Sequence, residues 1–240
     1  MKRSKIFMKN FAIIAAAGNG KRLYSYNSKM LVPILGKPLL SYTLDKFEEA
    51  KKIDDIILVI RSQDRKKIER EIIKKNNYSK IKTIIMGGTT RQESVFNGLM
   101  AIKENDGIVC IHDGARPLLK KWMIDETIKM IDIFDGIILA IPAVETIKKV
   151  ILSEMAVDRT VDRDKFWIVQ TPQTFRLGHI KEFYQRAMKE NIQVTDDSAI
   201  LEYYGGKVGI LRGSEENIKV TTKVDLLLAE ALIKKYSCLK

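Results

Sequence analysis

The sequence predicts an α/β protein with a mostly parallel central sheet, helices on both faces and a projecting β-arm. Short, continuously apolar segments alternate with segments of helical periodicity along most of the chain. This alternation is typical of parallel strands that are buried on both faces. Near residue 143 the alternation stops, and two extended segments follow that offer little to the core.

The strands and helices are expected in a regular order. Each expected strand is apolar and rich in β-branched residues, as in residues 11–16, 55–60, 81–86, 108–111, 137–142 and 207–211. Each expected helix repeats apolar residues every three or four positions, as in residues 39–50, 64–76, 91–102, 123–134, 177–191 and 224–236. Residues 30–38 contain two prolines and are expected to form a loop, and residues 166–169 are expected to return to the core.

Residues 143–165 are expected to form the arm. Segments 145–152 and 159–163 are extended, with a turn near residues 153–156. Little in them can bury a core face alone, so we expect a hairpin that projects and packs on a partner. A solvated surface hairpin is the alternative. We therefore expect a single domain over residues 11–236 with a dimerisation arm inserted in it, preceded by a loose basic extension over residues 1–10.

Composition restricts the class of protein. The 240 residues are 45% hydrophobic and 30% charged, with no apolar run as long as a membrane span. Residues 1–10 lack the apolar stretch of a signal peptide, and two cysteines are too few for a disulfide framework or a zinc site. We therefore expect a cytoplasmic protein. The net charge of +12 is spread over helices, which favours a polyanionic small molecule over nucleic acid.

A glycine-containing loop follows the first expected strand. Gly18 and Gly20 allow backbone N–H groups to approach a ligand closely, and Arg22 and Lys29 add two positive charges. The loop is neither a P-loop nor a complete dinucleotide fingerprint. A tight turn is the alternative, but the strand, the glycines and the cations together favour a phosphate site.

Ligands of open parallel sheets bind beyond the carboxyl ends of the strands, so loops 17–29, 87–91, 112–116 and 194–197 are expected to converge. These loops hold cations but no Ser-His-Asp set and no metal-ligand spacing. Cations without a base suit phosphoryl or nucleotidyl transfer, because an attacking phosphate needs no proton removed. A magnesium ion carried by the triphosphate would need a carboxylate, for which Asp113 is the candidate; a helix N-cap is its alternative role.

Several motifs occur in order and together resemble one known family. They are Ala15–Arg22, Lys29 with Gly36-Lys-Pro38, Gly87-Gly88-x-x-Arg91-x-x-Ser94, Ile111–Pro117, Thr146-Ile-Lys, Trp167–Phe175, Thr195-Asp-Asp197 and Asn217–Thr221. The chain is similar in these residues to 2-C-methyl-D-erythritol 4-phosphate cytidylyltransferases, over about residues 11–235. The resemblance implies a Rossmann-like nucleotidyltransferase fold, a homodimer formed through the arm, CTP as substrate and a divalent cation such as Mg²⁺.

The resemblance also implies site residues. Those expected to bind the nucleotide are Ala16, Ala17, Gly18, Gly20, Gly88, Ser94 and Asp113, with Asp113 near the ribose or the metal. Those expected to act in catalysis are Arg22 and Lys29, which would hold the triphosphate and stabilise the transition state, and Lys219 at the α-phosphate. Those expected to bind the polyol phosphate are Thr195, Thr221 and, on the arm of the other subunit, Thr146 and Arg163.

Some residues depart from the family pattern. Ser28 and Met30 flank Lys29 where the family commonly has Pro and Gln, and loop 23–27 is unusual. A ribitol-5-phosphate cytidylyltransferase shares the same expected fold and CTP site and is the nearest alternative. Residues 31–38 also resemble sugar-1-phosphate nucleotidyltransferases. A non-catalytic protein that binds nucleotides or other polyanions is a further alternative.

Overall fold

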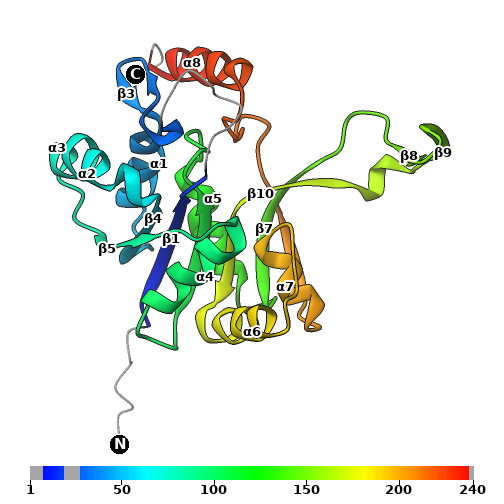
Figure 1. Ribbon diagram of the computed structural model, residues 1–240, viewed down its shortest axis with the longest axis horizontal. Helices are drawn as coiled ribbons and strands as arrows, with labels where there is room; N and C mark the ends of the chain where they lie inside the picture. The colour runs from blue at the N-terminus through cyan, green and yellow to red at the C-terminus, as the bar shows by residue number, and fades with distance from the viewer. Residues whose placement is uncertain (1–7, 19–27, 238–240) are drawn as a thin grey trace, which may run out of the picture.

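The computed structural model describes residues 8–18 and 28–237, and Figure 1 shows a central sheet with an arm that extends far from it. Within these residues, seven strands form the sheet in the order β11-β7-β10-β6-β1-β4-β5. Their bounds are β1 Asn10–Ala16, β4 Asp55–Ile60, β5 Ile81–Met86, β6 Ile108–Asp113, β7 Gly136–Pro142, β10 Trp167–Arg176 and β11 Val208–Arg212. All are mutually parallel except β10, which runs antiparallel to both β6 and β7. The predicted mostly parallel α/β fold is confirmed.

Helices cover both faces of the sheet because alternate residues of each strand point to opposite sides. On β1, Phe11 and Ile13 pack with α4, α6 and α7, whereas Ala12 and Ile14 pack with α1, α2, α5 and α8. The bounds are α1 Leu39–Glu48, α2 Arg65–Ile68, α3 Lys74–Asn76, α4 Arg91–Ala101, α5 Lys121–Met130, α6 Leu177–Lys189, α7 Asp197–Tyr203 and α8 Lys223–Ser237. None of the helices in the described ranges has the length and apolarity that a membrane span requires.

Several expected elements differ from those observed. The expected loop over residues 30–38 holds a 3-10 turn (Lys29–Leu31) and a short hairpin of β2 (Pro33–Ile34) and β3 (Lys37–Pro38). The helix expected over residues 64–76 is divided by a π-helical segment, Glu69–Ile73, between α2 and α3. Helix α7 was not expected at all. Residues 1–7 of the expected N-terminal extension lie outside the described residues, and Asn10 already belongs to β1.

The expectation that residues 166–169 return to the core is wrong. These residues are exposed because they form the outer part of β10, where Trp167 pairs with Pro142 at the base of the arm. The strand continues to Arg176, and its buried part begins at Gln170. Figure 1 shows β7 and β10 leaving the body together and leading to the hairpin of β8 (Lys148–Ile151) and β9 (Ala156–Thr160).

Gly107 allows the backbone just before β6 to pack closely against the backbone just before β1. Its φ is +122°, and a Cβ added there would lie 2.2 Å from the carbonyl oxygen of Lys9. Gly205, with φ +82°, has nothing within 4 Å of an added Cβ. Both positions favour glycine because their φ angles are positive, but only at Gly107 would an added Cβ also clash with a neighbouring atom.

We expect Gly107→Ala to lower the free energy of unfolding by about 1–3 kcal/mol more than Gly205→Ala does. Both variants carry the strain of positive φ, and only Gly107→Ala must also displace the backbone that positions β1 against β6. Urea unfolding of the two variants and the wild type measures the difference. Equal losses in the two variants would contradict this explanation.

Candidate active site

The first pocket lies at the carboxyl ends of β1, β5 and β6 and has a volume of about 430 Å³. Its lining residues are Ala15, Ala17, Gly18, Lys29, Met30, Gly88, Thr89, Thr90, Arg91, Ser94, Asp113, Ala115 and Lys219. Most of the residues expected to bind the nucleotide are therefore together. Ala16 is buried in β1 beside them, and Gly20 and Arg22 lie outside the described residues.

The start of α4 shapes one wall of this pocket. Thr90 caps the helix by accepting a hydrogen bond from the Glu93 N–H at 3.0 Å. The Ser94 hydroxyl accepts a hydrogen bond from the Gly88 N–H at 3.1 Å and donates one to the Thr90 carbonyl oxygen at 2.8 Å. A Cβ at Gly88 would lie 2.4 Å from that of Glu93, so the loop needs glycine there. Gly88 and Ser94, both expected to bind the nucleotide, are thus joined in one fixed local structure.

A second pocket of about 490 Å³ adjoins the first. Its lining residues are Arg91, Asp113, Arg116, Ile138, Val169, Gln170, Thr171, Gln173, Thr195, Asp196, Ser198, Ala199, Glu202 and Lys219. Thr195, which was expected to bind the polyol phosphate, lines this second pocket. Arg91, Asp113 and Lys219 line both pockets, so these three charged side chains form the wall between them.

Asp113, the last residue of β6, is the centre of this wall. Its carboxylate lies 2.8 Å from Lys219 Nζ, 3.1 Å from Arg91 Nε and 3.6 Å from Arg116 Nε. Burial alone would raise the pKa of the Asp113 carboxyl, but the charges of Arg91, Lys219 and Arg116 outweigh burial and hold that pKa well below its usual range. Asp113 is therefore ionised at neutral pH and fixes three cations at the junction.

The same contacts decide whether Asp113 could act as a metal ligand. Both carboxylate oxygens already contact cations, and a divalent ion at either oxygen would lie close to several positive charges. Among residues 8–18 and 28–237, no cluster of three or more His, Cys, Asp or Glu side chains could hold a metal. The arrangement does not fit Asp113 as a ligand of Mg²⁺, and phosphate oxygens of a bound triphosphate are the better donors.

His112 and Thr171 hold the loop that presents Asp113. The Thr171 hydroxyl oxygen accepts a hydrogen bond from the Asp113 N–H at 3.1 Å and lies 2.9 Å from His112 Nδ1. His112 Nε2 lies 3.3 Å from the Arg116 carbonyl oxygen. This network assigns the proton to Nε2, with Nδ1 accepting from Thr171. Burial lowers the pKa of His112 to about 3, although Asp113 opposes the shift, so the ring stays neutral.

Arg91 also binds a carboxylate to which the sequence analysis assigned no role. Its Nη1 and Nη2 donate to the two oxygens of Asp197, at 2.9 and 2.7 Å. Asp197 is completely buried at the start of α7, and the hydroxyl of Tyr184 on α6 donates to it as well. The sequence signal was the Asp-Asp pair after Thr195, but nothing in it identified Tyr184 as a partner.

The other expected site residues lie in different places. Lys29 is buried in the 3-10 turn at the edge of the first pocket. The Thr221 hydroxyl donates to Asp225 at 2.7 Å at the start of α8, and Thr221 lines neither pocket. Thr146 and Arg163 are exposed in the arm, where Arg163 Nη1 donates to the Val144 carbonyl oxygen at 2.7 Å. The fold thus separates these two residues from the pockets of their own chain.

The arm also exposes many large apolar side chains. They are Val144, Val150, Ile151, Leu152, Met155, Val157, Phe166, Trp167, Ile168 and Val169. Segments 145–152 and 159–163 were expected to offer little to the core, and the structure shows these apolar side chains exposed. Many exposed apolar side chains gathered on one projecting segment commonly mark an interface.

Comparison with known proteins gives a consistent result. The profile of the family described as 2-C-methyl-D-erythritol 4-phosphate cytidylyltransferase matches residues 10–235. A protein of that name from Clostridium acetobutylicum is 43% identical over 229 residues, which cover 95% of this chain and 99% of the relative. The crystal structure of 4-diphosphocytidyl-2C-methyl-D-erythritol synthase from Anaerococcus prevotii matches with a TM-score of 0.83 and 33% identity, covering 95% of this chain and 96% of that one. A 2-C-methyl-D-erythritol 4-phosphate cytidylyltransferase from Francisella tularensis matches with a TM-score of 0.78, also at 33% identity, over 93% and 99% of the two chains.

We expect His112 to make the free energy of unfolding fall as pH decreases below about 6.5, its unfolded pKa. Between that pH and its folded pKa of about 3, the unfolded chain binds a proton that the folded chain does not, so acid favours unfolding. The slope due to this residue approaches about 1.4 kcal/mol per pH unit. Urea unfolding between pH 7 and 5 should show a shallower dependence for His112→Asn than for the wild type. Parallel curves would contradict a neutral buried histidine.

Proposed function

This chain belongs to the 2-C-methyl-D-erythritol 4-phosphate cytidylyltransferase family, and from that premise we propose the reaction that it catalyses. It transfers CMP from CTP to 2-C-methyl-D-erythritol 4-phosphate, giving 4-diphosphocytidyl-2-C-methyl-D-erythritol and pyrophosphate, a step of isoprenoid biosynthesis. The observation that carries this proposal is the pair of adjoining pockets that share Arg91, Asp113 and Lys219. Two phosphate-bearing substrates can meet at such a wall, one in each pocket.

The chemistry needs positioned cations and no general base. An oxygen of the substrate phosphate attacks the α-phosphorus of CTP, and the bond from that phosphorus to the pyrophosphate oxygen breaks. Negative charge builds on the phosphoryl oxygens in the transition state, so fixed ammonium and guanidinium groups nearby lower the barrier. We assign this role to Lys29 and Lys219, together with Arg22. Lys219 is suited to it because it lines both pockets and Asp113 holds its ammonium.

The first pocket suits a nucleotide. Part of its lining consists of small residues, Ala17, Gly18 and Gly88, so a planar base can lie against the backbone without meeting a large side chain. The Gly88–Ser94 loop adds a hydroxyl and nearby backbone polar groups of fixed position. We assign cytosine recognition to Ala16, Ala17, Gly88 and Ser94.

A divalent cation, Mg²⁺ or an equivalent, is proposed to enter with the triphosphate. The support is chemical: a triphosphate supplies several oxygen ligands in close proximity, and hard cations prefer oxygen. The cations around Asp113 make that carboxylate a poor ligand, so the ion is proposed to depend on phosphate oxygens. The pocket residues bind and orient the nucleotide around it.

The arm is proposed to dock on a second copy of the chain and complete its second pocket. Its large apolar side chains are exposed in the single chain, and a partner surface would cover them. In a twofold dimer each arm reaches the other subunit, which gives two equivalent composite sites. Thr146 and Arg163 would then bind the polyol phosphate in trans, where a guanidinium suits a phosphate group.

Pyrophosphate release tests the proposed reaction. We expect turnover with CTP and 2-C-methyl-D-erythritol 4-phosphate, and loss of turnover when divalent cations are chelated. Ribitol 5-phosphate in place of the methylerythritol phosphate should give a much lower kcat/KM. Equal rates with UTP or ATP would exclude cytidylyl specificity, and a preference for ribitol 5-phosphate would overturn the assigned acceptor.

Mixing two inactive variants tests the composite site. Lys29→Ala removes a charge from the transition state, and loss of one such group typically lowers kcat by about 10²–10³-fold. Arg163→Ala disables the pocket of the opposite subunit if the arm acts in trans. After subunit exchange, half of the dimers are mixed, and each mixed dimer holds one intact site. The mixture should therefore regain up to about a quarter of wild-type activity.

The control for this experiment is each variant exchanged with itself, which should stay inactive. Mass spectrometry of isotopically labelled subunits verifies that exchange has occurred. If exchange is complete and activity stays at the level of the separate variants, Arg163 acts within its own chain.

A further inference from the structure

Tyr184 lies one layer behind the pockets and contacts neither substrate space. It is completely buried on α6, and its hydroxyl donates a hydrogen bond to Asp197 Oδ1. The same oxygen accepts from Arg91 Nη1 at 2.9 Å, while Asp197 Oδ2 accepts from Arg91 Nη2 at 2.7 Å. Asp197 therefore joins a buried tyrosine to an arginine that reaches the wall between the pockets.

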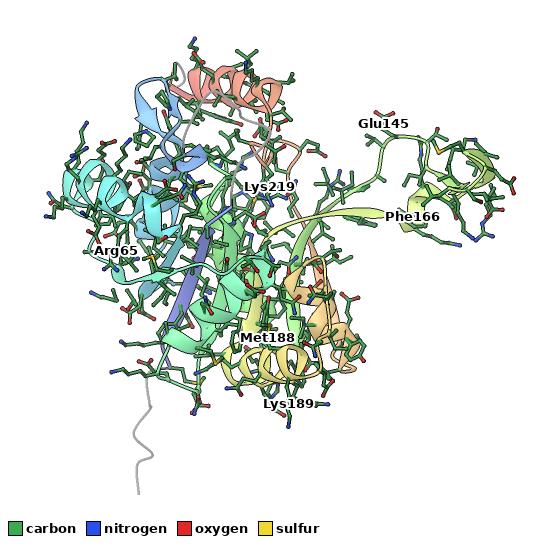
Figure 2. All side chains as sticks on the ribbon, in the orientation of Figure 1. Arg65, Glu145, Phe166, Met188, Lys189 and Lys219 are labelled. Atoms are coloured by element: carbon green, nitrogen blue, oxygen red, sulfur yellow. The ribbon has the colours of Figure 1, made fainter. Side chains whose placement is uncertain are left out.

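The contacts continue from Arg91 to Lys219. Arg91 Nε donates to Asp113 Oδ1 at 3.1 Å, and Asp113 Oδ2 lies 2.8 Å from Lys219 Nζ. A continuous series of charged contacts therefore runs from α6 through α7, α4 and β6 to Lys219. Figure 2 shows Lys219, the last member of this series, well separated from the end of α6, where Met188 and Lys189 are labelled.

We propose that Tyr184 and Asp197 are positioning residues for the transfer reaction: they fix the Arg91 guanidinium, which fixes the Asp113 carboxylate that holds the Lys219 ammonium. The inference rests on the proposed function, in which Lys219 acts at the reacting phosphate. To that function it adds two buried residues, Tyr184 and Asp197, that touch no substrate but fix the groups that do.

The balance of charges around Asp113 explains why a second carboxylate, Asp197, is needed. Asp113 faces Arg91, Arg116 and Lys219, so its single negative charge meets three positive charges that repel one another. Asp197 supplies a second negative charge that binds Arg91 through Nη1 and Nη2, so Arg91 reaches Asp113 only through Nε, at Oδ1, and leaves Oδ2 to Lys219 and Arg116. The bidentate contact also fixes the plane of the guanidinium, which a single hydrogen bond would leave free to rotate.

Tyr184 adds a further side-chain hydrogen bond to the Asp197 carboxylate. Asp197 is completely buried, so each missing hydrogen bond to it leaves an ionised oxygen less well solvated. Burial and the Asp197 charge raise the pKa of Tyr184 well above its usual value, so the hydroxyl keeps its proton and stays a donor. The backbone N–H of Asp197 donates to Gln173 Oε1 at 3.0 Å, which ties the start of α7 to β10.

Tyr184→Phe tests the proposal, with Tyr78→Phe as the matched control. Tyr78 is also nearly buried and donates to an aspartate, Asp45, at 2.8 Å, but it lines neither pocket. Each substitution removes one hydroxyl from a tyrosine–aspartate pair, and because Asp197 is buried whereas Asp45 is partly exposed, the loss of stability is expected in both variants and is larger for Tyr184→Phe. Melting temperature measures that effect.

Two readouts separate positioning from stability. We expect Tyr184→Phe to lower kcat by about 3–30-fold with little change in KM for CTP, the range typical of residues coupled to a site, and Tyr78→Phe to leave kcat unchanged. We also expect acetylation of Lys219, followed by mass spectrometry of its peptide, to be several-fold faster in Tyr184→Phe. An ammonium must leave its carboxylate partner before its amine can react, so weaker positioning exposes it.

The proposal is overturned if Tyr184→Phe lowers only the melting temperature, as Tyr78→Phe does, with kcat and Lys219 acetylation unchanged. A faster acetylation with unchanged kcat, or a lower kcat with unchanged acetylation, also overturns it, because the effect must pass through Lys219. If the wild type does not turn over the proposed substrates, the proposed function fails, while the acetylation rates still decide the positioning. Asp197→Asn, provided that it folds, should change both readouts more than Tyr184→Phe does.

Discussion

The site depends on one constraint: an ionised carboxylate, Asp113, must be held in the interior at the end of a central strand. Burial opposes its charge, so the surrounding fold must supply cations, and it supplies three from different elements. Those cations then repel one another, and Asp197 reduces the repulsion by binding Arg91. The charged wall between the two pockets is thus a balanced cluster whose members cannot be moved independently.

Sheet topology decides which residues can reach this cluster. Strands β1 and β6 are parallel neighbours, so Ala17 and Gly18 just after β1 and Asp113 at the end of β6 lie at one edge. Strand β10 runs the opposite way beside β6, and this orientation brings Thr171 and Gln173 to the same edge from its middle. One reversed strand therefore connects the arm, the second pocket and the anchor of α7.

Much of the fold and of the first pocket could be predicted because the relevant signals are local. Apolar runs define the strands, and Gly18, Gly88 and Ser94 belong to short motifs whose spacing limits their geometry. The error at residues 166–169 has a physical cause: the sequence of an apolar segment looks the same whether the segment lies in the core or is exposed, as these residues are. Tyr184, which pairs with Asp197 across two helices, has no signal in its own neighbourhood of the sequence.

The chain divides its chemistry between a body and an arm. In the body, the charged groups at the junction are partnered by neighbours in the same chain, so one chain sets the electrostatic field that a reacting phosphate meets. The arm carries exposed apolar side chains that its own chain does not cover, and it carries Arg163 far from the pockets of that chain. Charge stabilisation is therefore a property of a single fold. Under the proposed function, recognition through Arg163 needs a second chain, so a substitution in the body acts on the site of its own subunit, whereas a substitution at Arg163 acts on the site of the opposite subunit.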